Sequence, residues 1–128
     1  MDPIADMITR IKNAQISGQS SAIFPYSKMK FDLAMILQKE GFLKNVSKKG
    51  KKITKSIEVE LVYEDDRPKI SGVERVSKPS RRMYVESRNI KPVKNNLGRL
   101  IISTSKGLMT DSEARKSKIG GEALFKIW

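Results

Sequence analysis

The stretch from Leu100 to Gly107 constrains the fold more than any other part of this sequence. It begins with the consecutive apolar residues Leu100-Ile101-Ile102, which are typical of a buried strand. Three hydroxyl residues, Ser103-Thr104-Ser105, follow, and Lys106 and Gly107 come after them. Because hydroxyls donate and accept hydrogen bonds, we expect the strand to reach the surface there. Lys106 adds a charge suited to phosphate, so the segment predicts a contact surface for a polyanion.

The charge of the chain indicates the same kind of partner. Its 128 residues include 26 Lys and Arg against 14 Asp and Glu, which gives a formal net charge of +12. Such an excess repels itself unless an anionic partner neutralises it; nucleic acid is the first candidate and an anionic membrane surface the second. Residues 1–64 carry 11 basic and 7 acidic side chains, whereas residues 65–128 carry 15 basic and 7 acidic ones. The C-terminal half is therefore the stronger candidate for the anion-facing side.

Cysteine and histidine are both absent. A disulfide scaffold and a thiolate metal site are thereby excluded, and the commonest general base and metal ligand are missing. Ser103-Thr104-Ser105-Lys106 matches the S-x-x-K nucleophile motif of penicillin-binding enzymes, but the companion S-D-N and K-T-G motifs are missing and the chain is too short for that fold. We therefore predict a protein that is not an enzyme and needs no cofactor or metal, although the composition leaves carboxylate chemistry open.

The N-terminus does not resemble a signal peptide, because Asp2 and Asp6 interrupt it. No apolar run approaches the length that spans a membrane. We therefore expect a soluble, intracellular chain with no membrane partner.

The first half of the chain predicts two helices and a β-hairpin. Asp2 before Pro3 is typical of a helix start, and apolar residues at helical spacing then continue until Gly18. Residues 20–25 predict an extended segment, and Ser27 predicts the N-cap of a second helix that ends at Gly41. Strands are expected at 42–47 and 57–62, joined by a basic turn at 48–52 that either touches phosphate or is a solvated loop. The apolar faces of the two helices consist of Ile4, Met7, Ile8, Ile11 and Ala14, and of Phe31, Ala34, Met35, Ile36 and Leu37.

The second half predicts mainly strands. A polar, proline-containing break at 64–68 indicates a boundary between two subdomains, 1–65 and 66–128. Thr110-Asp111-Ser112-Glu113 is a capping box that begins a short helix, and Gly120-Gly121 predicts a turn. The remaining expectations are strands at 70–76, 81–85, 99–105 and 122–128, a turn at 77–80 and a short helix from 90 to 98. The fold class is α+β, with two small α+β subdomains that pack together and carry short mixed and antiparallel sheets.

The hydroxyls of Ser103, Thr104 and Ser105 admit two interpretations. They either bond to ribose and base edges in an RNA minor groove, or they satisfy the backbone of a polar strand end. Gly121 and Glu122 form a second candidate site, because glycines allow close approach to a ligand and a carboxylate accepts hydrogen bonds from base amino groups or a 2′-hydroxyl. The alternative for this pair is a hairpin turn with a solvated glutamate.

Four further side chains are candidates for RNA contacts. Tyr84 can stack on an unstacked base while Arg82 binds a phosphate, or Tyr84 is an ordinary strand aromatic. Lys28 and Lys30 lie in the first turn of the second predicted helix, where cations oppose the helix dipole. They indicate an anion there, with a solvated helix face as the alternative.

Several of these segments together resemble the universal small-subunit ribosomal protein eight family, in its bacterial or organellar form. The opening from Asp2 to Ala14 is similar to that of the family. Later signatures are matched by Glu40-Gly41-Phe42, 75–79, 103–111, 113–116, 120–122 and Trp128. The resemblance covers essentially the whole chain, and residues 103–128 carry its most specific motifs.

The resemblance implies α/β/β/α layering and a primary rRNA-binding protein of the central domain of the small-subunit RNA, which helps to organise the platform. It also implies neighbouring ribosomal proteins as partners, a cytoplasmic or organellar ribosome as location, a monomer when free, and repression of its own operon through a similar mRNA structure. The alternative function is a nonspecific basic nucleic-acid-binding module. The family's contacts carry over to Ser103, Thr104, Ser105, Lys106, Tyr84 and Glu122, and in the N-terminal region to Lys28, Lys30 and Thr9.

Overall fold

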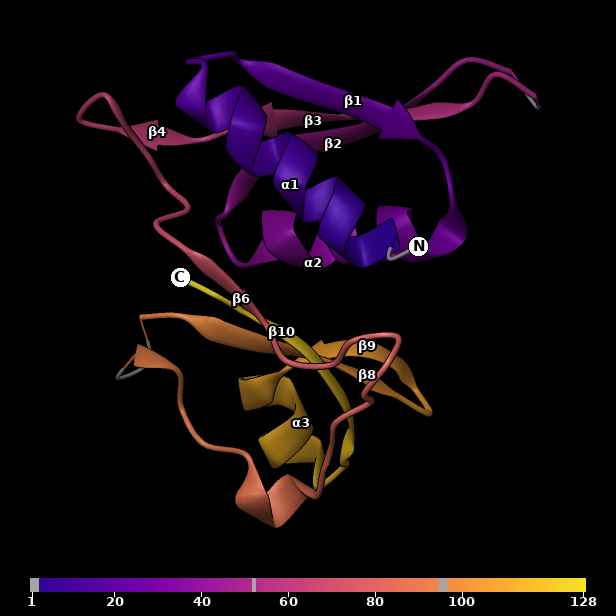
Figure 1. The fold of residues 1–128 in the computed structure, drawn as a ribbon, viewed down its shortest axis with the longest axis vertical. Helices are drawn as coiled ribbons and strands as arrows, with labels where there is room; N and C mark the ends of the chain where they lie inside the picture. The colour runs from indigo at the N-terminus through magenta and orange to yellow at the C-terminus, as the bar shows by residue number, and fades with distance from the viewer. Residues whose placement is uncertain (1–2, 52, 95–96) are drawn as a thin grey trace. The chain divides into compact units, whose positions relative to one another are not determined.

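The structure is a computed structural model that describes residues 3–51, 53–94 and 97–128. Three predictions include positions outside the described residues. These positions are Asp2 for the helix N-cap, Lys52 for the basic turn and residues 95–96 for the short helix. The chain forms two compact units, Pro3–Ile70 and Ser71–Trp128, each with helical and antiparallel strand elements (Figure 1). The α+β fold class is confirmed. Among the described residues, no helix is both long and apolar enough to cross a membrane.

In the N-terminal unit, two helices lie on one face of a three-stranded antiparallel sheet whose order is β1-β3-β2 (Figure 1). The apolar face of the first helix is buried as expected, and so are alternate residues of β3, Ile57, Val59 and Leu61. The core of this unit therefore lies between the helices and the sheet. The elements are α1 (Pro3–Ile16), β1 (Ser21–Pro25), α2 (Lys28–Lys39), β2 (Leu43–Lys49), β3 (Ser56–Leu61), β4 (Tyr63–Glu64) and β5 (Arg67–Pro68).

The ends of α2 follow the predicted capping signals. The Lys30 N–H donates to the Ser27 hydroxyl at 3.1 Å, which satisfies one of the free N–H groups of the first turn. At the other end Gly41 has a φ of +87°, and Phe42 N–H donates to Leu37 C=O at 2.8 Å. Only glycine adopts this φ without strain, so Gly41 ends the helix and returns Phe42 to the core.

The buried face of α2 is narrower than the sequence predicts. Leu33, Ala34 and Leu37 are buried, whereas Met35 is 43% exposed. The other two predicted residues, Phe31 and Ile36, are half-buried. A helix that lies on one face of a sheet buries one stripe, so an apolar residue outside that stripe stays in solvent.

The polar segment at 64–68 forms a small hairpin. Strands β4 and β5 pair antiparallel, and Asp65 and Asp66 between them have φ values of 52° and 63°. Two consecutive positive φ values are typical of the type I′ turn that joins tight hairpins. The boundary that the sequence suggested after residue 65 thus falls within this turn, and the structure divides the units after Ile70.

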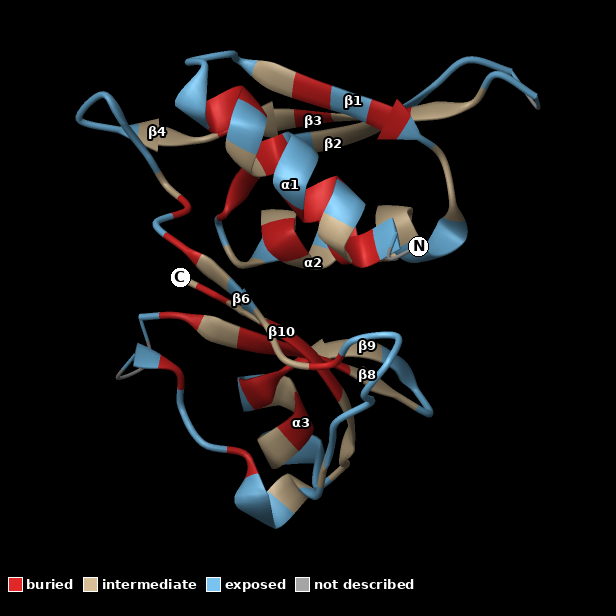
Figure 2. Cartoon of the chain, viewed as in Figure 1, coloured by how far each residue is buried: buried red, intermediate tan, exposed pale blue. Residues whose placement is uncertain are grey.

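The C-terminal unit has a sheet of order β6-β10-β8-β9, with β7 also paired to β10. One face packs against α3 and the segment before β8, and its core consists of Ile90, Val93, Leu100, Ile102, Ala114 and Ala123 (Figure 2). All strand pairs among the described residues are antiparallel, so the expectation of mixed sheets is wrong. The elements are β6 (Val73–Arg75), β7 (Tyr84–Val85), the 3₁₀ turn η1 (Ser87–Asn89), β8 (Arg99–Thr104), β9 (Gly107–Thr110), α3 (Asp111–Ser117) and β10 (Gly121–Ile127).

The capping box at Thr110 is confirmed. The Thr110 hydroxyl accepts from Glu113 N–H at 3.2 Å, and the Glu113 carboxylate accepts from Thr110 N–H at 3.1 Å. These bonds lie within four residues, which explains why local sequence was enough to place the start of α3.

The short helix expected from 90 to 98 does not begin at Ile90. The 3₁₀ turn η1 ends at Asn89, before the predicted start, and Ile90 after it is extended, with a φ of −80° and a ψ of 118°. Val93 forms a single β-bridge with Gly98. Pro92 disfavours helical backbone at the residue before it, and Ile90 and Val93 are buried in the core instead of on a helix stripe.

Candidate RNA interface

Strand β10 brings together residues that are far apart in the sequence. Glu122 lies opposite Tyr84 of β7 on one side and opposite Ser103 of β8 on the other. Residues directly opposite one another in paired strands project from the same face of the sheet. The three predicted site residues Tyr84, Glu122 and Ser103 therefore form one row, and Ser105 and Lys106 lie in the turn at the end of β8.

Glu122 is held by two side chains that precede β7. The Ser77 hydroxyl donates to the Glu122 carboxylate, and the Arg82 guanidinium donates to the same oxygen, Oε2, at 3.1 Å. Ser77 is buried and also accepts from Met83 N–H at 3.1 Å. The Glu122 side chain is only 16% exposed, so the interpretation of this residue as a solvated glutamate in a turn is wrong.

This environment favours the ionised carboxylate. The hydrogen bond from Ser77 lowers the pKa of Glu122 below its ordinary value of 4.5, and the bond and charge of Arg82 act in the same direction. The charge of Arg75 contributes further, whereas partial burial raises the pKa and opposes part of the effect. Near neutral pH the row therefore contains a fixed negative charge.

The two glycines before Glu122 permit strand pairing and do not form a turn. A Cβ atom on Gly121 would lie 2.2 Å from Ser103 C=O, and one on Gly120 would lie 2.4 Å from Val85 C=O. The turn after α3 occurs at Lys118, whose φ is 57°. The sequence predicted that these glycines allow the backbone to approach a ligand closely. In the structure they allow it to approach the neighbouring strands β7 and β8.

The three hydroxyls at the end of β8 differ in what they contact. The Thr104 hydroxyl donates to Gly107 C=O at 2.7 Å and accepts from Lys106 N–H at 3.1 Å. It therefore stabilises the β8–β9 turn. Within the part of the chain that the structure describes, the side-chain hydroxyls of Ser103 and Ser105 have no hydrogen-bond partner. Ser105 and Lys106 are exposed, so they are the residues of this turn that are open to a ligand.

Tyr84 is the most exposed aromatic residue near this row. Its side chain belongs to a short edge strand and the residue is 72% exposed. The prediction of an ordinary strand aromatic does not account for such exposure in a large apolar ring. Arg82, two residues earlier, forms an ion pair with Glu122, and 57% of its side chain is exposed.

Sequence reasoning missed Ser77 as a site residue. It lies at the end of the segment after β6, just before a two-residue turn in which Lys78 and Arg81 exchange backbone hydrogen bonds. A serine before Lys78-Pro79 is typical of a turn, and that local pattern gave no reason to expect a buried partner for Glu122.

The remaining predicted contacts belong to the N-terminal unit. Thr9 is exposed on α1, and Lys28 and Lys30 lie in the first turn of α2. The Lys28 ammonium pairs with the Asp32 carboxylate at 3.2 Å, one helical turn later. Asp32 therefore neutralises part of the positive charge at the start of α2, on which the prediction of a bound anion rested.

No cluster of three or more His, Cys, Asp or Glu side chains that could hold a metal ion occurs among the described residues. The chemistry of the row is that of hydroxyls, one carboxylate, one aromatic ring and nearby cations. Such a surface suits hydrogen bonding and stacking.

Comparison with known proteins identifies the family. The profile of the family "Ribosomal protein S8" matches residues 2–128. The small ribosomal subunit protein uS8 of Persephonella marina is 47% identical over 133 residues, with 99% of this chain and 98% of the relative covered. Those of Mesomycoplasma hyopneumoniae and Nitratidesulfovibrio vulgaris are 46% and 47% identical over 127 residues, with 99% of this chain and 96% and 98% of the relatives covered. The chain therefore belongs to the ribosomal protein S8 (uS8) family, whose members are structural proteins and not enzymes.

Proposed function

We propose that this chain is a primary rRNA-binding protein of the small ribosomal subunit, which binds a helix of the central domain of the rRNA and helps to organise the platform. The family assignment supports a place in the small subunit. The net charge of +12 supports a polyanionic partner. The observation that carries the proposal is the row of Tyr84, Glu122 and Ser103 on one face of the C-terminal sheet.

The row has the chemistry of a minor-groove reader. The shallow RNA minor groove displays 2′-hydroxyls and base edges, which short hydroxyl side chains such as Ser103 and Ser105 can reach. Among the described residues, Oε1 of Glu122 has no partner, whereas Oε2 is occupied by Ser77 and Arg82. Oε1 therefore remains able to accept from a base amino group or a 2′-hydroxyl.

The cations around this row provide attraction more than recognition. Lys106 lies beside Ser105 in the exposed turn, and more than half of the Arg82 side chain is exposed next to Glu122. Contacts from such groups to phosphate position a protein on RNA without reading its sequence. Tyr84 supplies a stacking surface for one unpaired base.

The residues Thr9, Lys28 and Lys30 form a second set of proposed contacts on the N-terminal unit. All three belong to the helices of that unit, and Lys28 and Thr9 are exposed. We assign them a supporting role, because Lys28 already shares its charge with Asp32. The proposal includes neighbouring ribosomal proteins as partners and a monomeric state outside the ribosome.

Repression of its own ribosomal-protein operon completes the proposal. An mRNA structure that offers the same minor groove and the same unpaired base would be bound by the same row. The location that follows is the cytoplasmic ribosome, or an organellar one if the chain comes from an organelle.

The experiment that tests the proposal is a footprint of the protein on small-subunit rRNA, followed by competition. We expect protection of one helix in the central domain and retention of that complex in excess tRNA. The alternative, a nonspecific basic module, is favoured by the net charge and by the exposed Lys48, Lys49 and Lys51 at the end of β2 and just after it. Displacement by tRNA or by anionic vesicles, or protection spread over the rRNA, would decide for that alternative.

A further inference from the structure

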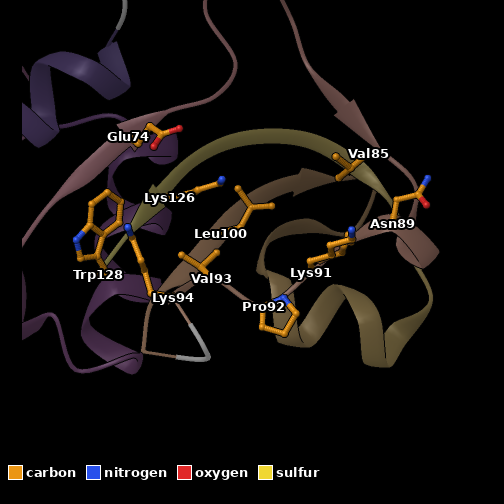
Figure 3. A pocket seen from close by; sticks show the side chains of 11 residues that line it. Glu74, Val85, Asn89, Lys91, Pro92, Val93, Lys94, Leu100, Lys126 and Trp128 are labelled. Carbon is orange, nitrogen blue, oxygen red and sulfur yellow. The ribbon is translucent and has the colours of Figure 1, made fainter.

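The C-terminal unit contains a cavity that is separate from the row. Its volume is about 400 Å³, within the range of sites for small ligands. It lies between the segment that runs from Asn89 to Lys94 and residues of strands β6, β8 and β10 (Figure 3). This segment does not begin the predicted helix at Ile90, and its residues Ile90 and Val93 belong to the core.

The rim of the cavity carries an excess of positive charge. The side chains of Lys91, Lys94 and Lys126 line it, against one carboxylate side chain, that of Glu74. Glu74 and Lys126 are opposite each other in β6 and β10, so both project from the same face. In the described part of the chain, no carboxylate lies within ion-pair distance of the three lysines. The site is therefore suited to an anion.

An aromatic ring forms one end of the cavity. The backbone N–H of Trp128 donates to Gly72 C=O at 3.1 Å. A Cβ atom on Gly72 would lie 2.6 Å from the nearest atom of the indole ring. The indole ring therefore packs directly against the backbone of Gly72. The Lys94 ammonium lies 4.7 Å from the centroid of this ring. Figure 3 shows the two side chains next to each other at the left of the view. Val93 and Leu100 continue the apolar wall toward Lys91.

We propose that this cavity binds one unstacked nucleotide of a single-stranded RNA segment. Its base replaces the Lys94 ammonium over the Trp128 ring, and its phosphate lies between Lys94, Lys91 and Lys126. A base presents a flat π-face to an aromatic ring, and its phosphate carries the charge that the lysines attract. An acidic peptide would pair with the lysines but offer no flat ring to the indole and no apolar group to the wall of Val93 and Leu100. The site extends the proposed function, because its RNA segment is distinct from the helix bound by Ser103 and Ser105.

The fluorescence of Trp128 provides a local test, because the chain contains a single tryptophan. A short oligoadenylate is added at fixed low salt and the indole emission is recorded. We expect saturable quenching as a base stacks on the ring. Lys94→Ala and Lys126→Ala should each raise the half-saturation concentration by about three- to tenfold, because each removes one phosphate contact. Lys116→Ala, an exposed lysine of α3, removes the same charge elsewhere and should change it little.

Three outcomes would overturn the proposal: no saturable quenching, quenching that is the same in both cavity variants as in Lys116→Ala, or equal half-saturation with an oligoglutamate peptide. The variant Ser105→Ala distinguishes binding at this cavity from binding at the row of Tyr84, Glu122 and Ser103. It should weaken binding to the structured rRNA helix and leave the oligoadenylate quenching unchanged. If the rRNA helix does not bind at all while quenching persists, the proposed function fails and the nucleotide site stands.

Discussion

The Ser77 hydroxyl donates a hydrogen bond to the Glu122 carboxylate across 45 residues of sequence, and this bond joins the turn before β7 to the first residues of β10. It fixes the one carboxylate of the proposed RNA-binding row. The same hydroxyl accepts from Met83 N–H, so it also sets the path of the chain into Tyr84. The geometry of the row therefore depends on a residue that does not belong to it.

Substitution of Ser77 by alanine should destabilise the C-terminal unit. The variant loses the bond to Glu122 and leaves the part-buried Met83 N–H without its partner, which together cost about 1–3 kcal/mol. Urea denaturation measures the free energy of unfolding. Ser80→Ala, an exposed serine of the same turn, is the control and should stay within about 0.5 kcal/mol of the parent. Equal midpoints for the two variants would contradict the assigned role of Ser77.

The pH dependence of stability should include a contribution from Glu122. Its pKa is lowered in the folded protein, mainly by the Ser77 hydrogen bond, so the ionised carboxylate stabilises the fold above the ordinary value of 4.5. That contribution is lost as the pH falls through the folded pKa. The difference in unfolding free energy between the parent and Glu122→Gln should therefore shrink as the pH falls below 4.5. A difference that stays constant down to strongly acidic pH would be inconsistent with this origin.

Alanine at Gly121 should disrupt the pairing of β8 with β10. The added methyl group would meet Ser103 C=O at 2.2 Å, and a backbone atom cannot move aside as a flexible side chain can. We expect a loss of about 1–3 kcal/mol in unfolding free energy, as for an overpacked core. Thermal denaturation, with Ser112→Ala on the exposed side of α3 as the control, measures this loss. An unchanged melting temperature for Gly121→Ala would show that the strands can separate at no cost.

Alanine substitutions at Ser105 and Thr104 should have different effects, the first on RNA affinity and the second on stability. Ser105→Ala should weaken binding to a structured helical RNA site by about 1–3 kcal/mol and leave the unfolding free energy unchanged, because the hydroxyl is exposed and free. Thr104→Ala should instead lower stability by about 0.5–1.5 kcal/mol, because it removes both hydrogen bonds of the turn. Binding is measured at fixed salt. Full affinity in Ser105→Ala would exclude Ser105 as a direct contact.

The salt dependence of RNA affinity should distinguish Lys106 from Ser103. A phosphate contact releases counterions, so Lys106→Ala should reduce the slope of log affinity against log salt by about 1. Ser103→Ala should lower affinity at every salt concentration and leave the slope unchanged. The measurement is a salt titration of both variants, and equal slopes for Lys106→Ala and the parent would remove Lys106 from the phosphate contacts.

The sequence by itself determined the features that depend on neighbouring residues. The capping box of Thr110 and Glu113 and the cap at Ser27 were correct because their bonds lie within one helical turn. The end of α2 at Gly41 was correct for the same reason, since its positive φ follows from the residue itself. Alternation placed β3, and helical spacing placed the buried face of α1, because one side of each element must be buried.

Tertiary structure decided what depends on distant partners. Leu124 interrupts the alternation of β10 with a bulge, since its C=O accepts from Val76 N–H, Ser77 N–H and the Arg75 guanidinium. Gly121 is needed because the Ser103 C=O lies close to its backbone, and Glu122 can be partly buried because Ser77 donates a hydrogen bond to its carboxylate. Local patterns carry no information on which strands become neighbours, because that pairing is set by burial and hydrogen bonding over the whole unit. The hydroxyl-rich end of β8 was thus visible in the sequence, whereas its position beside Glu122 and Tyr84 was a property of the folded sheet.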